Sequence, residues 1–334
     1  MPDSTPIHRV AADLHVSVML ERCVELLAPA IERGIAERGS AVVVDATLGM
    51  GGHTEALLER FERLTVVGLD RDTEAIRLAS ERLSGFGGRF VAVHAVYDEI
   101  DRALDTTGFS RETGALDGAL FDLGVSSLQL DDADRGFAYA QDAPLDMRMD
   151  RTSGRTAAEL IAEEPEGRLR ELFERYGEEP LAGRYARAIV AARQLAPLVR
   201  SGQLVDVLQA ATPAAVLGKR HPAKRVFQAL RVEVNGELAT LERALPAAIH
   251  RLRVGGRIVV MSFQSLEDRI VKRELAARSR STAPQGLPVE LPEHRPELKL
   301  LTRGAERADD TESAANPRAI PARLRAAERM REAS

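Results

Sequence analysis

A glycine-rich turn placed directly after a β-branched segment is the feature that most narrows the fold of this chain. Residues 41–45 read A-V-V-V-D, and the turn at 49–52 (G-M-G-G) leads into a stretch from about 53 to 61 with helical spacing. Such β-branched runs favour buried strands. Further strand-like segments follow at 64–70, 89–96 and 116–122, with a helical segment at 73–83. This alternation predicts an α/β fold in which helices cover a parallel sheet.

The strand signal disappears between about residues 131 and 230. Helical periodicity replaces it, and strand signal returns only at 256–263, after the turn Gly255-Gly256. The predicted helices are residues 157–161, 168–176, 182–194 and 203–210. We therefore predict a sheet domain made of residues 10–130 and 233–334, with a helical domain, residues 131–232, inserted between its two parts.

The end of the chain has weaker signals. Short strands are expected at 299–302 and 322–326, and the polar segment 303–316 between them is expected to be mobile. Residues 279–296 are rich in Pro, Ser and Gly and are expected to form a loop.

Composition excludes several classes of protein. The chain has one cysteine, Cys23, so it can hold neither a disulfide framework nor a thiolate-ligated cluster, and no metal site is expected. No stretch is apolar enough to span a bilayer and no secretory signal opens the chain, so we expect a cytoplasmic protein. A net charge of -5 argues against non-specific coating of nucleic acid. Local cationic patches can still contact RNA, above all Lys219, Arg220, Lys224 and Arg225.

The first strand and turn are suited to a nucleoside. A glycine turn lets the backbone approach a ligand closely, and the helix that follows points its N-terminus toward it. Asp70 ends the second strand, where an acid can accept hydrogen bonds from both ribose hydroxyls. Alone, this pattern fits NAD as well as S-adenosylmethionine, and Asp70 could instead be a surface acid before a helix.

The end of the fourth strand favours S-adenosylmethionine. It reads D-L-G-V-S-S-L-Q, which places Asp122, Ser126, Ser127 and Gln129 at the edge of the sheet where ligands bind in open α/β folds. A nicotinamide enzyme would also need a proton donor and a substrate clamp, and no convincing candidate is present. A methyltransferase needs mainly alignment and exclusion of water, because its cofactor is already activated.

Several longer motifs resemble one family, the bacterial small-subunit ribosomal RNA (cytosine-N4)-methyltransferase H family, also called MraW. They include D-A-T-L-G-M-G-G-H-T, G-L-D-R-D, D-L-G-V-S-S-L-Q-L-D-D-A-D-R-G-F, P-L-D-M-R-M-D, V-F-Q-A-L-R-V-E-V-N-G-E-L and S-L-E-D-R-I-V-K-R, and the resemblance runs from about residue 15 to 329. It implies a Rossmann-like S-adenosylmethionine-dependent methyltransferase fold with an inserted helical domain. The implied substrate is a decoding-centre cytosine of 16S ribosomal RNA in the small subunit.

The resemblance also implies cofactor contacts at seven positions. They are Gly51, Gly52, His53, Asp70, Tyr97, Asp122 and Gln129. The chain departs from the family in three places: Gln264 replaces a histidine in S-F-Q-S-L-E-D, the ending after N-P-R-A differs, and Tyr97 stands where phenylalanine is common. Any acid–base role of position 264 is therefore in doubt.

The residues favour methylation of the exocyclic nitrogen over carbon 5. Carbon-5 methylation needs a cysteine nucleophile, and Cys23 falls on a predicted apolar helix. The amine can attack directly, with Asp122 and Ser126 as candidate acceptors for its N–H and Ser262 to Gln264 on the opposing strand end. Helix or turn capping is the alternative for the serines. Asp146, Arg148 and Asp150 are interpreted as structural ion pairs, with contact to RNA as the alternative.

RNA contacts are expected in the inserted domain. Besides the four cations, Phe227 could stack on an unpaired base, or it could be a buried anchor of its helix.

Two other functions stay open. A DNA amino-methyltransferase would carry a D/S-P-P-Y/F/W motif where this chain has D-L-G-V, so no DNA substrate is expected. A non-catalytic assembly factor of the small subunit is compatible with the change at Gln264.

Overall fold

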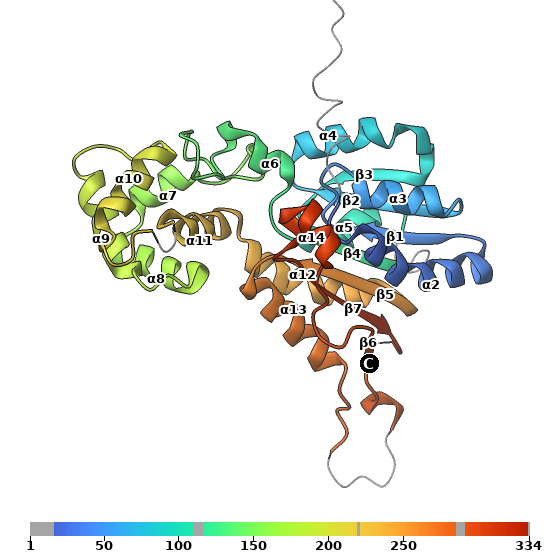
Figure 1. The fold of residues 1–334 in the computed structure, drawn as a ribbon. Helices are drawn as coiled ribbons and strands as arrows, with labels where there is room; N and C mark the ends of the chain where they lie inside the picture. The colour runs from blue at the N-terminus through green and yellow to red at the C-terminus, as the bar shows by residue number, and fades with distance from the viewer. Residues whose placement is uncertain (1–16, 110–115, 219–220, 285–290, 333–334) are drawn as a thin grey trace, which may run out of the picture. The chain divides into compact units, whose positions relative to one another are not determined.

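The computed structural model describes residues 17–109, 116–218, 221–284 and 291–332. The chain forms two compact units. One contains the residues up to Gly124 together with those from Ala239 onward, and the other is the segment Val125–Leu238 (Figure 1). The second unit thus starts and ends a few residues outside the segment 131–232 that the sequence set apart.

The first unit is built on one seven-stranded sheet with the order β3-β2-β1-β4-β5-β7-β6. Strands β1 to β5 pair in parallel, and β7 is antiparallel to both β5 and β6. The bounds are β1 Ala41–Asp45, β2 Leu64–Asp70, β3 Phe90–His94, β4 Leu116–Asp122, β5 Leu252–Ser262, β6 Leu298–Leu300 and β7 Arg323–Arg329. The strand order reverses between β1 and β4, which is the switch point where α/β sheets bind ligands. The predicted Rossmann-like α/β fold is confirmed.

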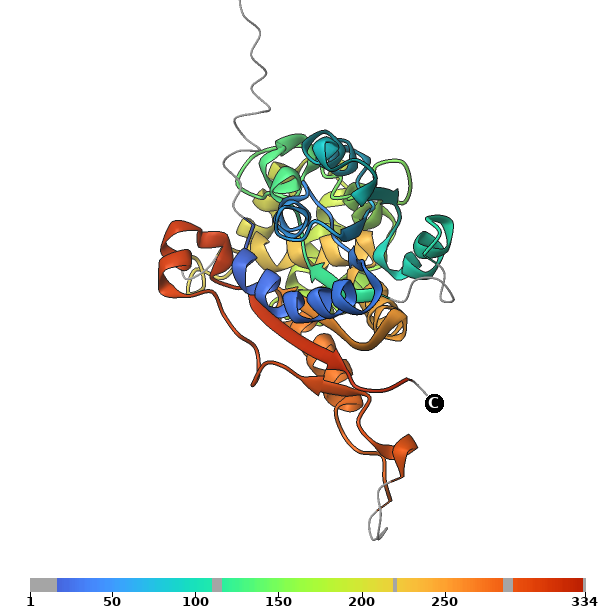
Figure 2. The same ribbon diagram turned by 90° about the vertical axis from the view of Figure 1, so that its right-hand side faces the viewer.

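Helices pack on both faces of this sheet. Alternate residues of each strand point to opposite faces, so Val43 packs in the core beside α2 and α3, whereas Val44 packs in the core beside α5 and α12. The helices are α2 Leu20–Arg38, α3 Gly52–Arg60, α4 Thr73–Arg82, α5 Ile100–Thr106, α12 Glu237–Arg251, α13 Ser265–Arg278 and α14 Asp310–Ala315. Figure 2 shows α2 lying along the C-terminal strands, where Arg33 is 3.7 Å from Glu328 of β7.

The second unit is helical and has its own core. Its helices are α6 Ser127–Asp131, α7 Ala157–Glu163, α8 Glu166–Gly177, α9 Ala182–Arg193, α10 Ser201–Ala211 and α11 Ala223–Asn235. Leu172, Phe173, Tyr185 and Leu230 are among its fully buried side chains. Since this core shares no residue with the two clusters of the sheet unit, each unit encloses a separate hydrophobic interior.

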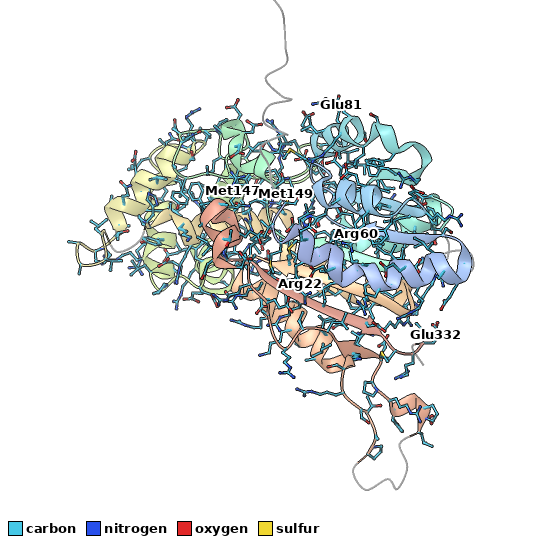
Figure 3. All side chains as sticks on the ribbon, turned by 45° about the vertical axis from the view of Figure 1, so that its right-hand side comes forward. Arg22, Arg60, Glu81, Met147, Met149 and Glu332 are labelled. Carbon is cyan, nitrogen blue, oxygen red and sulfur yellow. The ribbon has the colours of Figure 1, made fainter. Side chains whose placement is uncertain are left out.

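Two expectations are corrected. Gly255 and Gly256 do not precede the fifth strand but lie inside β5, where the register with β4 shifts; Gly255 has a φ of 85° that a bulge accommodates. The segment 303–316 is structured rather than mobile. It contains α14, and two of its side chains bond to α2 or to the N-cap residue of α2. The Arg22 guanidinium, labelled in Figure 3, bonds Glu306 at 2.7 Å, and Glu312 accepts from Met19 N–H at 2.6 Å. No helix in the described ranges is long and apolar enough to cross a membrane.

Candidate active site

The glycine-rich turn follows β1 along the chain, and its backbone is hydrogen-bonded to the end of β2. Gly49 and Gly51 have φ values of 52° and 80°, which favour glycine, and Leu48 N–H donates to Leu69 O at 2.9 Å. Helix α3 begins immediately afterwards, at Gly52. The turn is therefore fixed against β2, and a helix N-terminus opens beside it.

The glycines of this turn serve different purposes. A Cβ on Gly52 would come 2.2 Å from Ser17 Oγ, and one on Gly51 would come 2.9 Å from Leu83 Cδ1. A side chain at either position would therefore have to displace a neighbouring side chain, and at Gly51 it would also have to adopt a positive φ. A Cβ on Gly49 would meet only Thr47 O, at 3.9 Å, so the backbone there has open space in which a ligand can approach.

Asp70 lies at the end of β2 and holds the turn. Its Oδ2 accepts from Gly49 N–H and its Oδ1 from Asp72 N–H, both at 2.8 Å. Burial raises the pKa of Asp70 to about 6. Each carboxylate oxygen has a second lone pair, so both can still accept a hydroxyl hydrogen, as a nucleoside ribose requires.

Tyr97 follows β3 in a short turn, Tyr97–Glu99, on the next strand along from Asp70. Its half-buried ring packs edge-to-face on Phe121 of β4, with the centroids 6.0 Å apart. The fixed ring offers an apolar surface of the kind an adenine needs.

Asp122 ends β4, and one of its carboxyl oxygens has no hydrogen-bond partner among the residues that the structure describes. Its Oδ1 is buried and receives no hydrogen bond from the described part of the chain, although the side chain as a whole is 29% exposed. Burial and the charges of Asp45 and Glu267 raise the pKa of Asp122 to about 8. A carboxyl group held this way at a strand end costs stability, which is typical of a functional site.

His53 lies between the turn and Asp122. It is the second residue of α3 and only 6% exposed; its Nε2 is 3.1 Å from Val18 O and its Nδ1 is 3.9 Å from Asp122 Oδ2. The ring thus connects the start of α3 to the end of β4, and it occupies the helix start that the sequence indicated.

Asp45, which ends β1, is a candidate site residue that the sequence analysis did not single out. Its Oδ2 accepts from the Thr54 hydroxyl at 2.7 Å, and burial raises its pKa to about 6. Because β1 lies between β2 and β4, Asp45, Asp70 and Asp122 end three neighbouring strands. The acid at the end of A-V-V-V-D was the signal that could have identified it.

The end of β5 adds two more unpartnered polar atoms. Ser262 Oγ and Gln264 Oε1 are both buried without a hydrogen-bond partner in the described ranges. Gln264 is the N-cap of α13, and its Nε2 donates to Glu267 Oε1 at 3.3 Å. Glu267 Oε2 also accepts from Phe263 N–H and Gln264 N–H. Glu267, which the sequence analysis missed, thus orients the Gln264 amide.

Ser126 and Gln129 cap a helix in the other unit. Ser126 Oγ accepts from Gln129 N–H at 3.3 Å, and Gln129 Oε1 accepts from Ser126 N–H at 3.1 Å. Their side chains form the capping box of α6, as the structural alternative for Ser126 supposed. The side chain of Ser127 lies outside the described part of the chain.

The structure places the residues that were expected to contact RNA in different environments. Lys219 and Arg220 lie outside the described residues. Lys224 is exposed on α11, and the Arg225 guanidinium donates to Glu178 O. Phe227 is 3% exposed and belongs to the core of the helical unit, so it is unavailable for stacking on a base and acts as the buried anchor.

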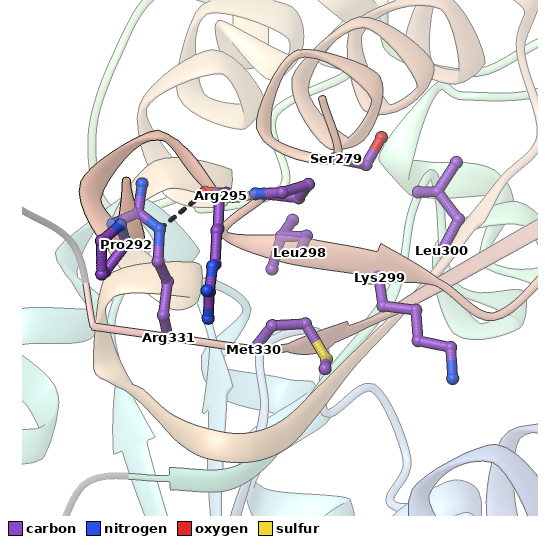
Figure 4. A pocket seen from close by; sticks show the side chains of 9 residues that line it. Ser279, Pro292, Arg295, Leu298, Lys299, Leu300, Met330 and Arg331 are labelled. Atoms are coloured by element: carbon purple, nitrogen blue, oxygen red, sulfur yellow. Dashed lines mark hydrogen bonds between the residues drawn. The ribbon is translucent and has the colours of Figure 1, made fainter. Parts of the chain in front are cut away.

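An open pocket of about 740 Å³ lies elsewhere in the sheet unit, against β6 (Figure 4). Its lining includes Arg295, Lys299 and Arg331, and the Arg331 guanidinium is already bonded to backbone carbonyl groups such as Arg295 O. Leu298 of β6 pairs with Arg329, whereas Arg323 at the other end of β7 pairs with Ser262. The pocket is therefore at the edge of the sheet opposite the carboxyl ends, and it is not part of the candidate active site.

Comparison with known proteins gives matches over nearly the whole chain. The model of the MraW methylase family matches residues 12–330. The ribosomal RNA small subunit methyltransferase H of Leifsonia xyli subsp. xyli is 65% identical over 96% of both chains. That of Clavibacter michiganensis subsp. michiganensis is 63% identical over 96% of this chain and 98% of its own. Among solved structures, an rRNA methylase from Streptococcus thermophilus has a TM-score of 0.43 at 12% identity, covering 95% of this chain and 99% of its own.

Proposed function

This chain belongs to the MraW methylase family, and we propose that it transfers the methyl group of S-adenosylmethionine to N4 of a cytosine in 16S ribosomal RNA. The family makes it a methyltransferase of ribosomal RNA; the nitrogen and the base are our inference. The observation that carries this inference is the buried Asp122 Oδ1 at the end of β4, which no described residue bonds and which lies one strand from the Asp45 carboxyl and two from Asp70.

The cofactor is assigned to the edge formed by β1, β2 and β3. Asp70 would hold the ribose hydroxyls, Tyr97 would pack on the adenine, and the backbone at Gly49 leaves room for close approach. The cofactor supplies a methyl group already activated by its sulfonium. The protein therefore needs to align the attacking nitrogen and keep water out.

Cys23 cannot supply the nucleophile that carbon-5 methylation requires. The side chain is fully buried in α2, with its Sγ 3.7 Å from Met261 Sδ, and burial raises the pKa of the thiol well above its ordinary value. Its reactive thiolate form is thereby suppressed. Direct attack by the exocyclic amine needs no such group.

Two buried acceptors could orient that amine. Asp122 Oδ1 and Gln264 Oε1 lack partners within the described ranges, and each stands at the carboxyl end of a central strand or just after it. An N–H held by such an acceptor turns the nitrogen lone pair toward the methyl group, and the proton released afterwards is acidic enough to reach water. Ser126, by contrast, is engaged in capping α6, so we keep it as the weaker candidate.

Substrate recognition is assigned to the helical unit. We propose that the cationic start of α11 contacts ribosomal RNA in the decoding centre of the small subunit, and that Gln129 and Gly51, Gly52 and His53 complete the cofactor site. The chain would act on the small subunit in the cytoplasm.

The test is to incubate purified small subunits with the protein and isotopically labelled S-adenosylmethionine, digest the RNA, and analyse the nucleosides by mass spectrometry. Labelled N4-methylcytidine is expected, both with the wild-type chain and with Cys23→Ala. Labelled 5-methylcytidine would overturn the assignment of the nitrogen. Absence of any labelled nucleoside would favour the non-catalytic assembly factor.

A further inference from the structure

The helical unit carries an aromatic stack that runs from its core to its surface. The rings of Tyr139 and His221 are stacked, with centroids 4.4 Å apart and planes 25° from parallel. Tyr139 in turn meets the buried Phe227 edge-to-face at 5.9 Å. Tyr139, which is distant in the sequence from the other two residues, therefore links His221 and Phe227 into one series of contacting rings.

The outermost ring of this series is accessible. His221 is exposed, whereas Tyr139 is half-buried between His221 and Phe227. The imidazole is also held in place, because His221 Nδ1 accepts from Ala223 N–H at 3.3 Å and Pro222 fixes the backbone that follows. A flat ring that is already immobilised loses little conformational entropy when something stacks on it.

Positive charge lies next to the exposed ring. Lys224, one turn away at the start of α11, is exposed, and its ammonium group makes no hydrogen bond or ion pair with any of the described residues. A planar π-surface beside a free cation is the combination that single-stranded nucleic acids require, a stacking partner for the base and a charge for the phosphate.

We propose that His221, supported by Tyr139, is a platform on which an unpaired base of the RNA substrate stacks, with Lys224 contacting an adjacent phosphate. This inference rests on the proposed function and names how the helical unit holds its RNA. It replaces the stacking role expected of Phe227, whose contribution is to anchor Tyr139 from below.

The absence of tryptophan from the chain gives a direct test. His221→Trp keeps an aromatic ring at the platform and introduces the single tryptophan of the protein, whose fluorescence is quenched when a base stacks on it. Leu195→Trp, at a side chain 90% exposed in the same unit, is the matched control. Addition of a short single-stranded oligoribonucleotide should quench the fluorescence of His221→Trp and leave that of Leu195→Trp unchanged; equal quenching, or none, would overturn the proposal.

A second variant guards against a local disturbance by the larger ring. His221→Ala should raise the KM for small subunits about five- to tenfold, the lower end of the effect of removing one stacked base, with kcat and cofactor affinity unchanged. His294→Ala, in the sheet unit, is the control. An unchanged KM in His221→Ala contradicts the platform. If the wild-type chain neither binds nor methylates small subunits, the proposed function itself fails and the platform fails with it.

Discussion

The three acids that end β1, β2 and β4 in the sheet unit differ electrostatically from two arginine-paired acids of the helical unit. In the sheet unit, burial raises the pKa of Asp45 and Asp70 to about 6 and that of Asp122 to about 8. In the helical unit the pKa values of Asp142 and Asp146 are lowered. Asp146 is partly buried, which raises its pKa, but hydrogen bonds from Arg148 at 2.7 and 2.9 Å outweigh that effect.

This difference in pKa distinguishes acids that are candidates for binding or catalysis from acids that stabilise the fold. An acid that is paired with an arginine stabilises its own unit and has little capacity left for a ligand. Asp122 lies near two other acids and keeps one oxygen without a hydrogen bond from the described residues. Such an arrangement lowers stability, and it persists in a fold where the site needs it. We therefore expect substitutions in the two units to have opposite consequences.

The largest effect is expected on catalysis. Asp122→Ala should lower the rate of methyl transfer at saturating cofactor about a hundredfold, because the nitrogen nucleophile loses the acceptor that orients it. The rate is measured with purified small subunits and labelled cofactor. Asp146→Asn should keep a rate close to that of the wild type, and a rate that falls equally in both variants would remove the distinction between the units.

The next effect concerns cofactor binding. Asp70→Ala should weaken the affinity for S-adenosylmethionine roughly ten- to a hundredfold, since a charge-assisted contact to the ribose is worth about 1.5–3 kcal/mol. Isothermal titration calorimetry measures this directly. Unchanged affinity would exclude Asp70 from the site.

In the helical unit the expected effect is on stability. Asp146→Ala removes the carboxylate that pairs with Arg148 and should lower the free energy of unfolding by about 1.5–3 kcal/mol. Chemical denaturation gives the value. Cofactor affinity should not change, and a loss of affinity in this variant would show that Asp146 is not merely structural.

The smallest effect is expected for the cationic surface. Replacing Lys219, Arg220, Lys224 and Arg225 by Ala should weaken RNA binding and its dependence on salt. The slope of log affinity against log salt concentration should become shallower by about 0.7 for each phosphate that the variant no longer neutralises. Arg170 and Arg187, also exposed in the helical unit, serve as the control pair. An unchanged slope in the quadruple variant would identify the patch as solvated surface only.

Much of the sheet unit could be predicted from the sequence. β1, β2 and β4 have the predicted bounds, because short, mainly apolar runs that end at an acid indicate a buried strand and its end together. Asp70 and Asp122 end their strands at the predicted positions for the same reason. The glycine pair in β5 was misplaced because a bulge and a turn both use a residue with positive φ.

Interactions between distant segments could not be predicted in this way. Phe227 has the same sequence surroundings whether it faces the core or solvent, and only the packing of α11 against its neighbours decides. The partner of His221 is Tyr139, and nothing near either residue indicates the other. Glu267 accepts hydrogen bonds from the backbone N–H groups of Phe263 and Gln264, just after β5. These bonds form only when α13 has folded.

The most direct test of the central claim is the free energy of unfolding of the wild-type chain and of Asp122→Asn as a function of pH. With a pKa near 8 in the folded state and near 4 in the unfolded state, Asp122 keeps a proton that the unfolded chain has already lost. The folded state then binds more protons, so its stability falls as pH rises toward 8 and levels off above it.

Asp45 and Asp70 contribute in the same sense only up to about pH 6, so the interval from pH 6 to 8 isolates Asp122. There the wild type should lose stability relative to Asp122→Asn, by at most about 1.4 kcal/mol per pH unit, while Asp146→Asn keeps the wild-type slope. We predict that Asp122→Asn is more stable than the wild type at pH 8. Parallel slopes for wild type and Asp122→Asn between pH 6 and 8 would contradict this prediction.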